Sequence, residues 1–333
     1  PPPPLYKPPA PTEIYTNTES SAASDVYKRQ ALPVSTTHAT VGAMIGFGIM
    51  AQGFSVINWG KLGAVVASWI ISPVFSMAIG YGMFKIIVRF IVSQKNAAQR
   101  AMQLSPIFIG MAGFVVVLSF LFKTPLGNQL AISTPMALLA ALVLAAAIGL
   151  LGHGLIKRFM PDDAENGAEG IFRKIQIGTS CYVALAQGAN DVANAIGPLA
   201  VIYFLVKTGG VGTTVPVPLF LLLFGGVGIA AGIAMAGHRV MDTIGHRITT
   251  LTNTRGFSVD FAAATTVMVA SKMGLPVSTT HAAVGGVMGV GLARGLEAIN
   301  FNIIFRIVLY WILTVPAAAF TCMAVFKILS FFV

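Results

Sequence analysis

Long apolar runs are the feature that most limits what this chain can fold into. Several of them, including 106–122, 136–156 and 219–236, approach the roughly 20 residues that cross a bilayer as a helix. Only 10% of the residues are charged, against about 25% in soluble domains. We therefore predict an all-α polytopic membrane protein in contact with lipid. The predicted crossing segments are 37–56, 62–92, 106–122, 136–156, 175–206, 219–236, 257–273, 279–292 and 303–332.

The basic residues lie mostly between these segments. The net charge of +10 is therefore read as cytoplasmic loops under the positive-inside rule, and no nucleic-acid partner is predicted. Three segments have this character, namely 85–100, 157–174 and 239–255. Counting crossings from them places residues 31–43 on the cytoplasmic side and residues 274–286 on the opposite side.

These two stretches are copies of one motif. They read "ALPVSTTHATVGA" and "GLPVSTTHAAVGG", and the similarity continues in "SWIISP" at 68–73 and "YWILTVP" at 310–316. Repeats of opposite orientation are typical of carriers built from two related halves, with substrate bound where interrupted helices meet. We predict an inverted-repeat transporter with broken or re-entrant helices, and Pro73 and Pro198 as break points.

The same reasoning divides the chain. Residues 1–30 are proline-rich, polar and without an initiator methionine, so we expect a foreign or disordered leader. Residues 31–156 are then the remainder of the first half, with its beginning missing. Residues 157–174 form a cytoplasmic linker, and residues 175–333 form the second half.

Each motif copy has the composition of an anion site. Pro276 cannot continue a helix from upstream, and Ser278 is a good N-cap for a helix that follows. Exposed N–H groups at such a helix start, beside hydroxyl groups, suit an oxyanion, although the serine and threonine side chains could instead serve only as caps. The predicted phosphate contacts in the two copies are Ser35, Thr36, Thr37, Ser278, Thr279 and Thr280. For His38 and His281, phosphate contact, proton relay and bonding to a carbonyl all stay open.

A second polar group lies within "AQGANDVANAIGP" at 186–198. On a helix, Gln187, Asn190, Asp191 and Asn194 share one face. An acid inside a membrane segment is costly and is usually functional, so these four residues are predicted to bind a cation. Asn190 and Asn194 are also predicted to donate to phosphate. Asp260, in or at the edge of another apolar segment, is a further candidate for the cation or proton site.

The combination of "GANDVANAIGP" at 188–198 with two "PVSTTH" elements resembles the inorganic phosphate transporter (PiT) family. The resemblance covers residues 31–333. It implies symport of inorganic phosphate with Na⁺ or H⁺, or in some bacterial members of a neutral metal–phosphate complex. Family members carry a GAND-type element in each half, and this chain has only the second. Asp260 stands where the family pattern has glutamate.

We therefore expect a secondary active phosphate symporter that works by alternating access and needs no cofactor beyond the co-transported ion. Enzyme motifs such as HExxH and GxSxG do not occur in the sequence, so an enzyme is not predicted. A passive anion channel and an inactive truncated fragment stay as alternatives. The expected location is a bacterial inner membrane, and the coupling ion and any homo-oligomer stay open.

Overall fold

The protein is predominantly helical in the part described by the computed structural model, which comprises residues 33–123, 133–159, 167–209, 215–273 and 277–332. The short 3-10 helices η1 (Phe54–Val56) and η5 (Leu296–Ala298) join longer helices, and the π-helices η2 (Val88–Val92) and η4 (Thr243–Ile248) extend α3 and α8. The predicted all-α fold is confirmed. The helices of the described residues are α2 (Thr36–Gln52), α3 (Trp59–Ile87), α4 (Ala97–Lys123), α6 (Thr134–Phe159), α7 (Gly167–Thr208), α8 (Leu219–Asp242), α9 (Asn253–Lys272), α10 (Thr279–Arg294) and α11 (Phe301–Leu329).

Six helical segments in the described residues are long and apolar enough to cross a membrane, which makes this a multi-pass membrane protein. The short helices α2 and α10, of 17 and 16 residues, are not among them. At 1.5 Å per residue each is about 25 Å long, less than the roughly 30 Å hydrocarbon thickness. The segments 37–56 and 279–292, which the sequence predicted as crossings, are therefore not among the candidate spans of the described residues. The six segments are Trp59–Val92, Ala97–Phe122, Thr134–Arg158, Asn190–Thr208, Leu219–Ile248 and Phe301–Leu329.

Each motif copy opens a helical hairpin, and the two hairpins are built alike. Helix α2 ends at Gly53, whose φ of 77° favours glycine, and η1 leads to Asn58, which caps α3 by accepting from the Lys61 N–H at 3.0 Å. Helix α10 ends at Gly295 with φ 122°, and η5 leads to Asn300, which caps α11. The repeat seen in the sequence therefore extends to the turn chemistry of both hairpins.

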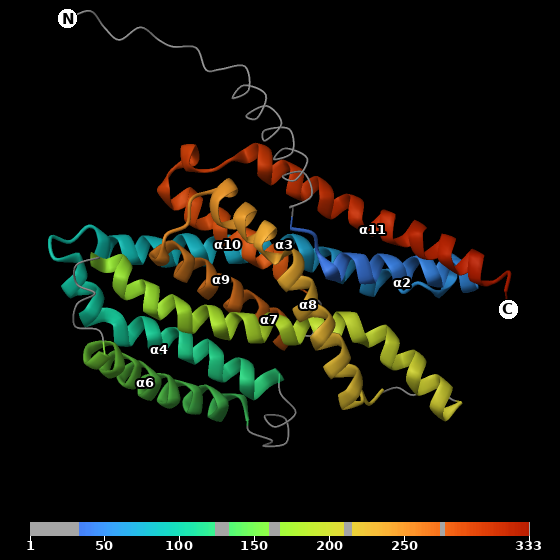
Figure 1. The fold of residues 1–333 in the computed structure, drawn as a ribbon, viewed down its shortest axis with the longest axis horizontal. Coiled ribbons are helices and arrows are strands. Elements are labelled where there is room, and N and C mark those ends of the chain that lie inside the picture. The colour runs from blue at the N-terminus through green and yellow to red at the C-terminus, as the bar shows by residue number, and fades with distance from the viewer. Residues whose placement is uncertain (1–32, 124–132, 160–166, 210–214, 274–276, 333) are drawn as a thin grey trace, which may run out of the picture.

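The hairpins interlock, because each short helix packs mainly on the long helix of the other hairpin. Helix α10 packs on α3, and α2 packs on α11 (Figure 1). Glycines allow this close approach. A Cβ atom at Gly285 would lie 2.3 Å from the Pro73 carbonyl oxygen, and one at Gly46 would lie 2.3 Å from that of Ala319. Close helix contact at a glycine is thus present in both copies of the motif.

The predicted break points at Pro73 and Pro198 are wrong. Helix α3 continues through Pro73, and α7 continues through Pro198. Proline removes one backbone N–H, but a membrane helix tolerates this loss when a neighbouring group bonds to the carbonyl that is left over. For Pro73 that carbonyl belongs to Trp69, and His281 bonds to it at 2.9 Å. The described residues instead show new helix starts at α2 and α10, each capped by a serine.

Helix α7 connects the predicted linker to the second polar motif. It has 42 residues and packs against α4, α9, α8 and α2. Residues 157–159 end α6, and residues 167–174 form the first two turns of α7. The predicted linker 157–174 is therefore partly helical at both ends, and its cytoplasmic location stays a prediction. The leader 1–30 and Pro276 lie outside the described residues.

Glu169, in the first turn of α7, caps the start of α9. Its carboxylate accepts from the backbone N–H of Thr254 at 3.0 Å and from the hydroxyls of Thr252 and Thr254 at 2.8 and 2.6 Å. A negative charge at a helix start also interacts favourably with the helix dipole. This contact fixes α9 to α7 at the end of the bundle.

We predict that Glu169→Ala destabilises the purified protein by about 2 kcal/mol, because α9 loses a charged cap and two threonine hydroxyls lose an acceptor. A thermal melt in detergent measures this loss. Glu297→Ala removes the same charge from an exposed residue of η5 and is the matched control, with an unchanged melting temperature. Equal melting temperatures for both variants would contradict the capping role.

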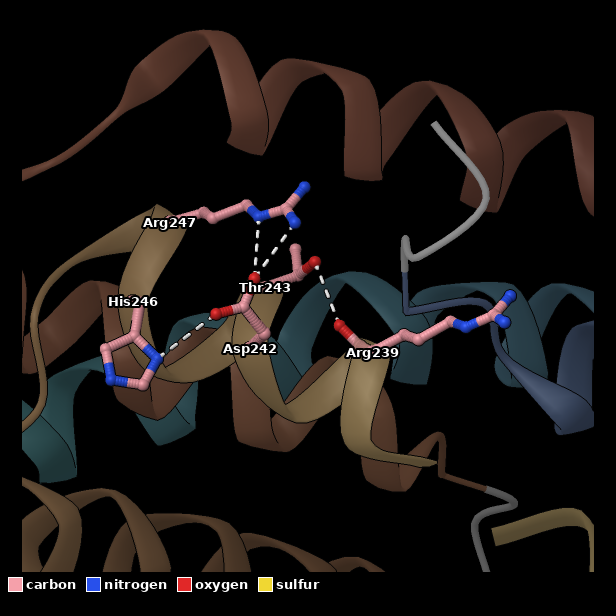
Figure 2. A network of polar contacts seen from close by, with 5 residues as sticks. All are labelled: Arg239, Asp242, Thr243, His246 and Arg247. Carbon is pink, nitrogen blue, oxygen red and sulfur yellow. Dashed lines mark hydrogen bonds and ion pairs between the residues drawn. The ribbon is translucent and has the colours of Figure 1, made fainter. Parts of the chain in front are cut away.

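The basic segment after α8 forms its own ion pairs. Asp242 binds Arg247 at 2.9 Å and lies 3.5 Å from His246, while the Thr243 hydroxyl donates to the Arg239 carbonyl (Figure 2). The Asp242 side chain is half exposed. This network stabilises the end of α8 and is separate from the motif residues described next.

Candidate functional site

The two PVSTTH elements form helix starts that meet head to head. Ser278 accepts from the His281 N–H at 3.3 Å, so the predicted N-cap is confirmed, and Ser35 accepts from the His38 N–H at 3.2 Å in the same way. The centroids of the two histidine rings are 4.5 Å apart. From this point α2 and α10 extend to opposite sides (Figure 1), as inverted halves require.

The meeting point concentrates hydrogen-bond donors. The N–H groups of the first residues of a helix have no acceptor within that helix, and here two such sets, at Thr36 and Thr37 and at Thr279 and Thr280, are close together. Both helix dipoles place partial positive charge at the same location. Such a pair of helix starts is suited to bind an oxyanion.

Asp191 of α7 lies between the two starts. Its carboxylate accepts from the Thr279 hydroxyl at 3.4 Å. One turn further along α7, the Asn194 amide donates to the Thr37 hydroxyl at 3.1 Å. The polar face predicted for α7 therefore contacts both motif copies.

The site is buried on one side and open on the other. Ser35, Thr37, Ser278 and Thr279 have exposed fractions of 1%, 2%, 1% and 7%, whereas Thr36 is exposed and Asp191 is partly exposed. The carboxylate, amide and hydroxyl oxygens are hard ligands for a small cation. The helix starts beside them bind anions. The arrangement can therefore hold a cation and an oxyanion in contact.

The other predicted members of the group have fewer contacts. Within the described part of the chain, Gln187 and Thr280 form no side-chain hydrogen bond, and the Nδ2 atom of Asn190 is buried without an acceptor in good geometry. Asn190 is next to Asp191 in sequence and on the same face of α7. These side chains have hydrogen-bonding capacity available for a ligand.

Both histidines bond to backbone carbonyls. His38 Nδ1 lies 3.0 Å from the Trp311 oxygen, and His281 Nδ1 lies 2.9 Å from the Trp69 oxygen. Of the three roles left open by the sequence, bonding to a carbonyl is therefore observed in both copies. Phosphate contact and proton relay stay untested.

Asp260 is not part of the Asp191 group. Its carboxylate accepts from the Ser180 hydroxyl at 2.5 Å, and Ser180 precedes Asp191 by 11 residues on α7. At 1.5 Å per residue this is a separation of roughly 16 Å along the helix. The predicted cation role of Asp260 is thus a prediction about a second location.

Three residues at these sites were not predicted from the sequence. Ser180 carries no motif that marks it. Trp69 and Trp311 lie in the repeated "SWIISP" and "YWILTVP" segments, and a tryptophan shared by both segments was a signal that could have identified them. Their carbonyls and rings contact the motif histidines.

Comparison with known proteins agrees with this geometry. The family model described as "Phosphate transporter family" matches residues 21–322. The chain belongs to the phosphate transporter family. A protein of Thermococcus kodakarensis named as a phosphate permease is 46% identical over 90% of this chain and 73% of its own length. The chloroplastic inorganic phosphate transporter 2-1 of Arabidopsis thaliana is 38% identical over 86% of this chain and 53% of its own length.

One solved structure is similar to most of the chain described here. The protein, titled "The sodium-dependent phosphate transporter", has 41% sequence identity and a TM-score of 0.82, and the match covers 92% of this chain and 76% of the other. The resemblance found in the sequence is confirmed. The expectation that the chain is not an enzyme is also confirmed, because the family and the relatives named above are transporters or permeases.

Proposed function

We propose that this protein transports inorganic phosphate together with Na⁺ by alternating access. The observation that supports this most strongly is that one face of α7 reaches both helix starts, through the bond of Asp191 to Thr279 and the bond of Asn194 to Thr37. In the proposal, phosphate binds between Ser35–Thr37 and Ser278–Thr280, with Asn190 and Asn194 as further donors. The cation binds at Asp191 with oxygens of Gln187, Asn190 and Asn194.

Electrostatics couples the two substrates. A doubly charged anion in a low-dielectric cavity is costly unless opposite charge compensates it, and the carboxylate of Asp191 would repel it. A cation on Asp191 removes this repulsion and adds attraction to phosphate. The fully loaded site and the empty site are therefore the forms that can change their orientation in the membrane.

The donor set and one comparison favour Na⁺ over H⁺. Carboxylate, amide and hydroxyl oxygens lie close together around Asp191, and a small hard cation can use several of them at once, whereas a proton needs only one. The similar solved structure is titled as sodium-dependent. We further propose a prokaryotic plasma membrane as its location, because named relatives include archaeal and bacterial permeases.

A gradient experiment in proteoliposomes tests this proposal. We predict that an inward Na⁺ gradient drives labelled phosphate above its external concentration, and that a pH gradient alone does not. Accumulation driven by the pH gradient without Na⁺ would contradict sodium coupling. Uptake that stops at equal concentrations under both gradients would indicate a passive channel and contradict symport.

A further inference from the structure

Four aromatic rings form a continuous column where the two helix starts meet. The His38 ring lies 3.8 Å from the Trp69 ring, the two histidine rings are 4.5 Å apart, and the His281 ring lies 3.6 Å from the Trp311 ring. The exposed fractions of the four side chains are all 7% or less. We call Trp69, His38, His281 and Trp311 the aromatic column.

Hydrogen bonds across the column join the two hairpins. The His281 ring stacks on the Trp311 ring, and the His38 ring packs against the Trp69 ring at a tilt of 36°. Each histidine thus packs against the tryptophan of its own hairpin and bonds to the tryptophan carbonyl of the other. A carbonyl oxygen only accepts, so both Nδ1 atoms must carry the hydrogen and donate it. Trp311 also donates from Nε1 to the Pro33 carbonyl at 3.1 Å, which fixes the segment just before α2.

The bond from His281 satisfies the Trp69 carbonyl, which has no donor within helix α3. The Trp69 carbonyl would accept from residue 73 in a regular helix, but residue 73 is proline and has no N–H. An unsatisfied carbonyl inside a membrane is costly, and His281 supplies the donor at 2.9 Å. The bond therefore has a strong reason to persist, and it determines the position of the first turn of α10 on α3.

We propose that His38 and His281 are positioning residues, which hold the two Ser-Thr-Thr helix starts at a fixed separation through their Nδ1 bonds. This inference rests on the proposed function, since those starts are the proposed phosphate contacts. Each histidine follows directly after the threonines of its motif, so a shift of its ring moves the donors that face phosphate. Displacements of about 1 Å are enough to weaken a preorganised site strongly.

Asparagine and glutamine variants identify the nitrogen that matters. The amide nitrogen of asparagine can occupy the position of Nδ1, and that of glutamine the position of Nε2. We predict that His281→Asn keeps the KM for phosphate within about threefold, while His281→Gln and His281→Leu raise it about tenfold. The same series at His38 is predicted to give the same order. The pH profile of uptake by His281→Asn is predicted to match that of the unchanged protein.

The series includes a matched control and outcomes that overturn the proposal. His246, exposed and beside Asp242 (Figure 2), is replaced in the same three ways and should leave the KM unchanged. Retained affinity in His281→Gln with loss in His281→Asn would instead indicate phosphate contact through Nε2. Loss in all three variants with an altered pH profile would indicate a proton relay.

A thermal melt separates this inference from the proposed function, because it needs no transport. His281→Leu is predicted to lower the melting temperature of the detergent-purified protein by about 3 °C or more, and His281→Asn to restore it. If the unchanged protein takes up no phosphate, the proposed function is wrong. The two melting temperatures still test whether the His281 bond holds the hairpins together. Equal melting temperatures for His281→Leu and the unchanged protein would overturn the positioning role of His281.

Discussion

Replacing Asp191 with asparagine is expected to reduce Na⁺-driven phosphate uptake by about 100-fold or more. The substitution keeps the size of the side chain and its ability to accept from Thr279, but removes the charge that we propose to hold the cation. Loss of one member of a desolvated charge pair typically costs about 3–5 kcal/mol, which corresponds to at least 100-fold. Initial rates of labelled phosphate uptake in proteoliposomes measure the effect.

Asp242→Asn is the matched control for this variant. It removes the same charge from a half-exposed residue that pairs with Arg247 and His246 (Figure 2), where an ion pair contributes about 0–1 kcal/mol. Uptake by this control should stay within about twofold of the unchanged protein. Unreduced Na⁺-driven uptake by Asp191→Asn would contradict the role assigned to Asp191.

The second large effect is expected from Gly285→Leu, which should prevent the hairpins from interlocking. A Cβ atom at this position would lie 2.3 Å from the Pro73 carbonyl oxygen and 2.7 Å from the Pro73 Cα atom, and both belong to the backbone of α3. Neither atom can rotate away, so α10 must separate from α3. Overpacking a close contact costs about 1–3 kcal/mol or more, and four heavy atoms are added here.

Size-exclusion chromatography of detergent extracts measures this effect as the yield of monodisperse protein. Gly232→Leu on α8 is the control, because a Cβ atom there has nothing within 4 Å. We expect Gly285→Leu to give little monodisperse protein and Gly232→Leu to give a normal yield. A normal yield and melting temperature for Gly285→Leu would show that the close approach of α10 to α3 is not needed for folding.

Much of the candidate site could be predicted because it depends on local sequence. Serine before a helix accepts from the backbone N–H three residues later, and both Ser35 and Ser278 do so. A helical spacing of three and four residues places Asp191 and Asn194 on one face, and both contact the motif threonines.

The rest could not be predicted because it depends on how distant segments pack. Nothing local indicates that α2 packs on α11, and without that exchange the partners of His38 and His281 cannot be identified. The break expected at Pro73 was wrong for the same reason, since the bond that compensates for this proline comes from residue 281. The position of Asp260 beside Ser180 also depends on the register between α9 and α7.

The most direct test is a crystal structure of the protein from crystals grown with Na⁺ and arsenate. Arsenate is an analogue of phosphate, and the anomalous scattering of arsenic shows where the anion binds. We predict one arsenate between residues 35–37 and residues 278–280, within hydrogen-bond distance of both helix starts and next to a cation on Asp191. An arsenate bound elsewhere, with the space between the two helix starts empty, would contradict it.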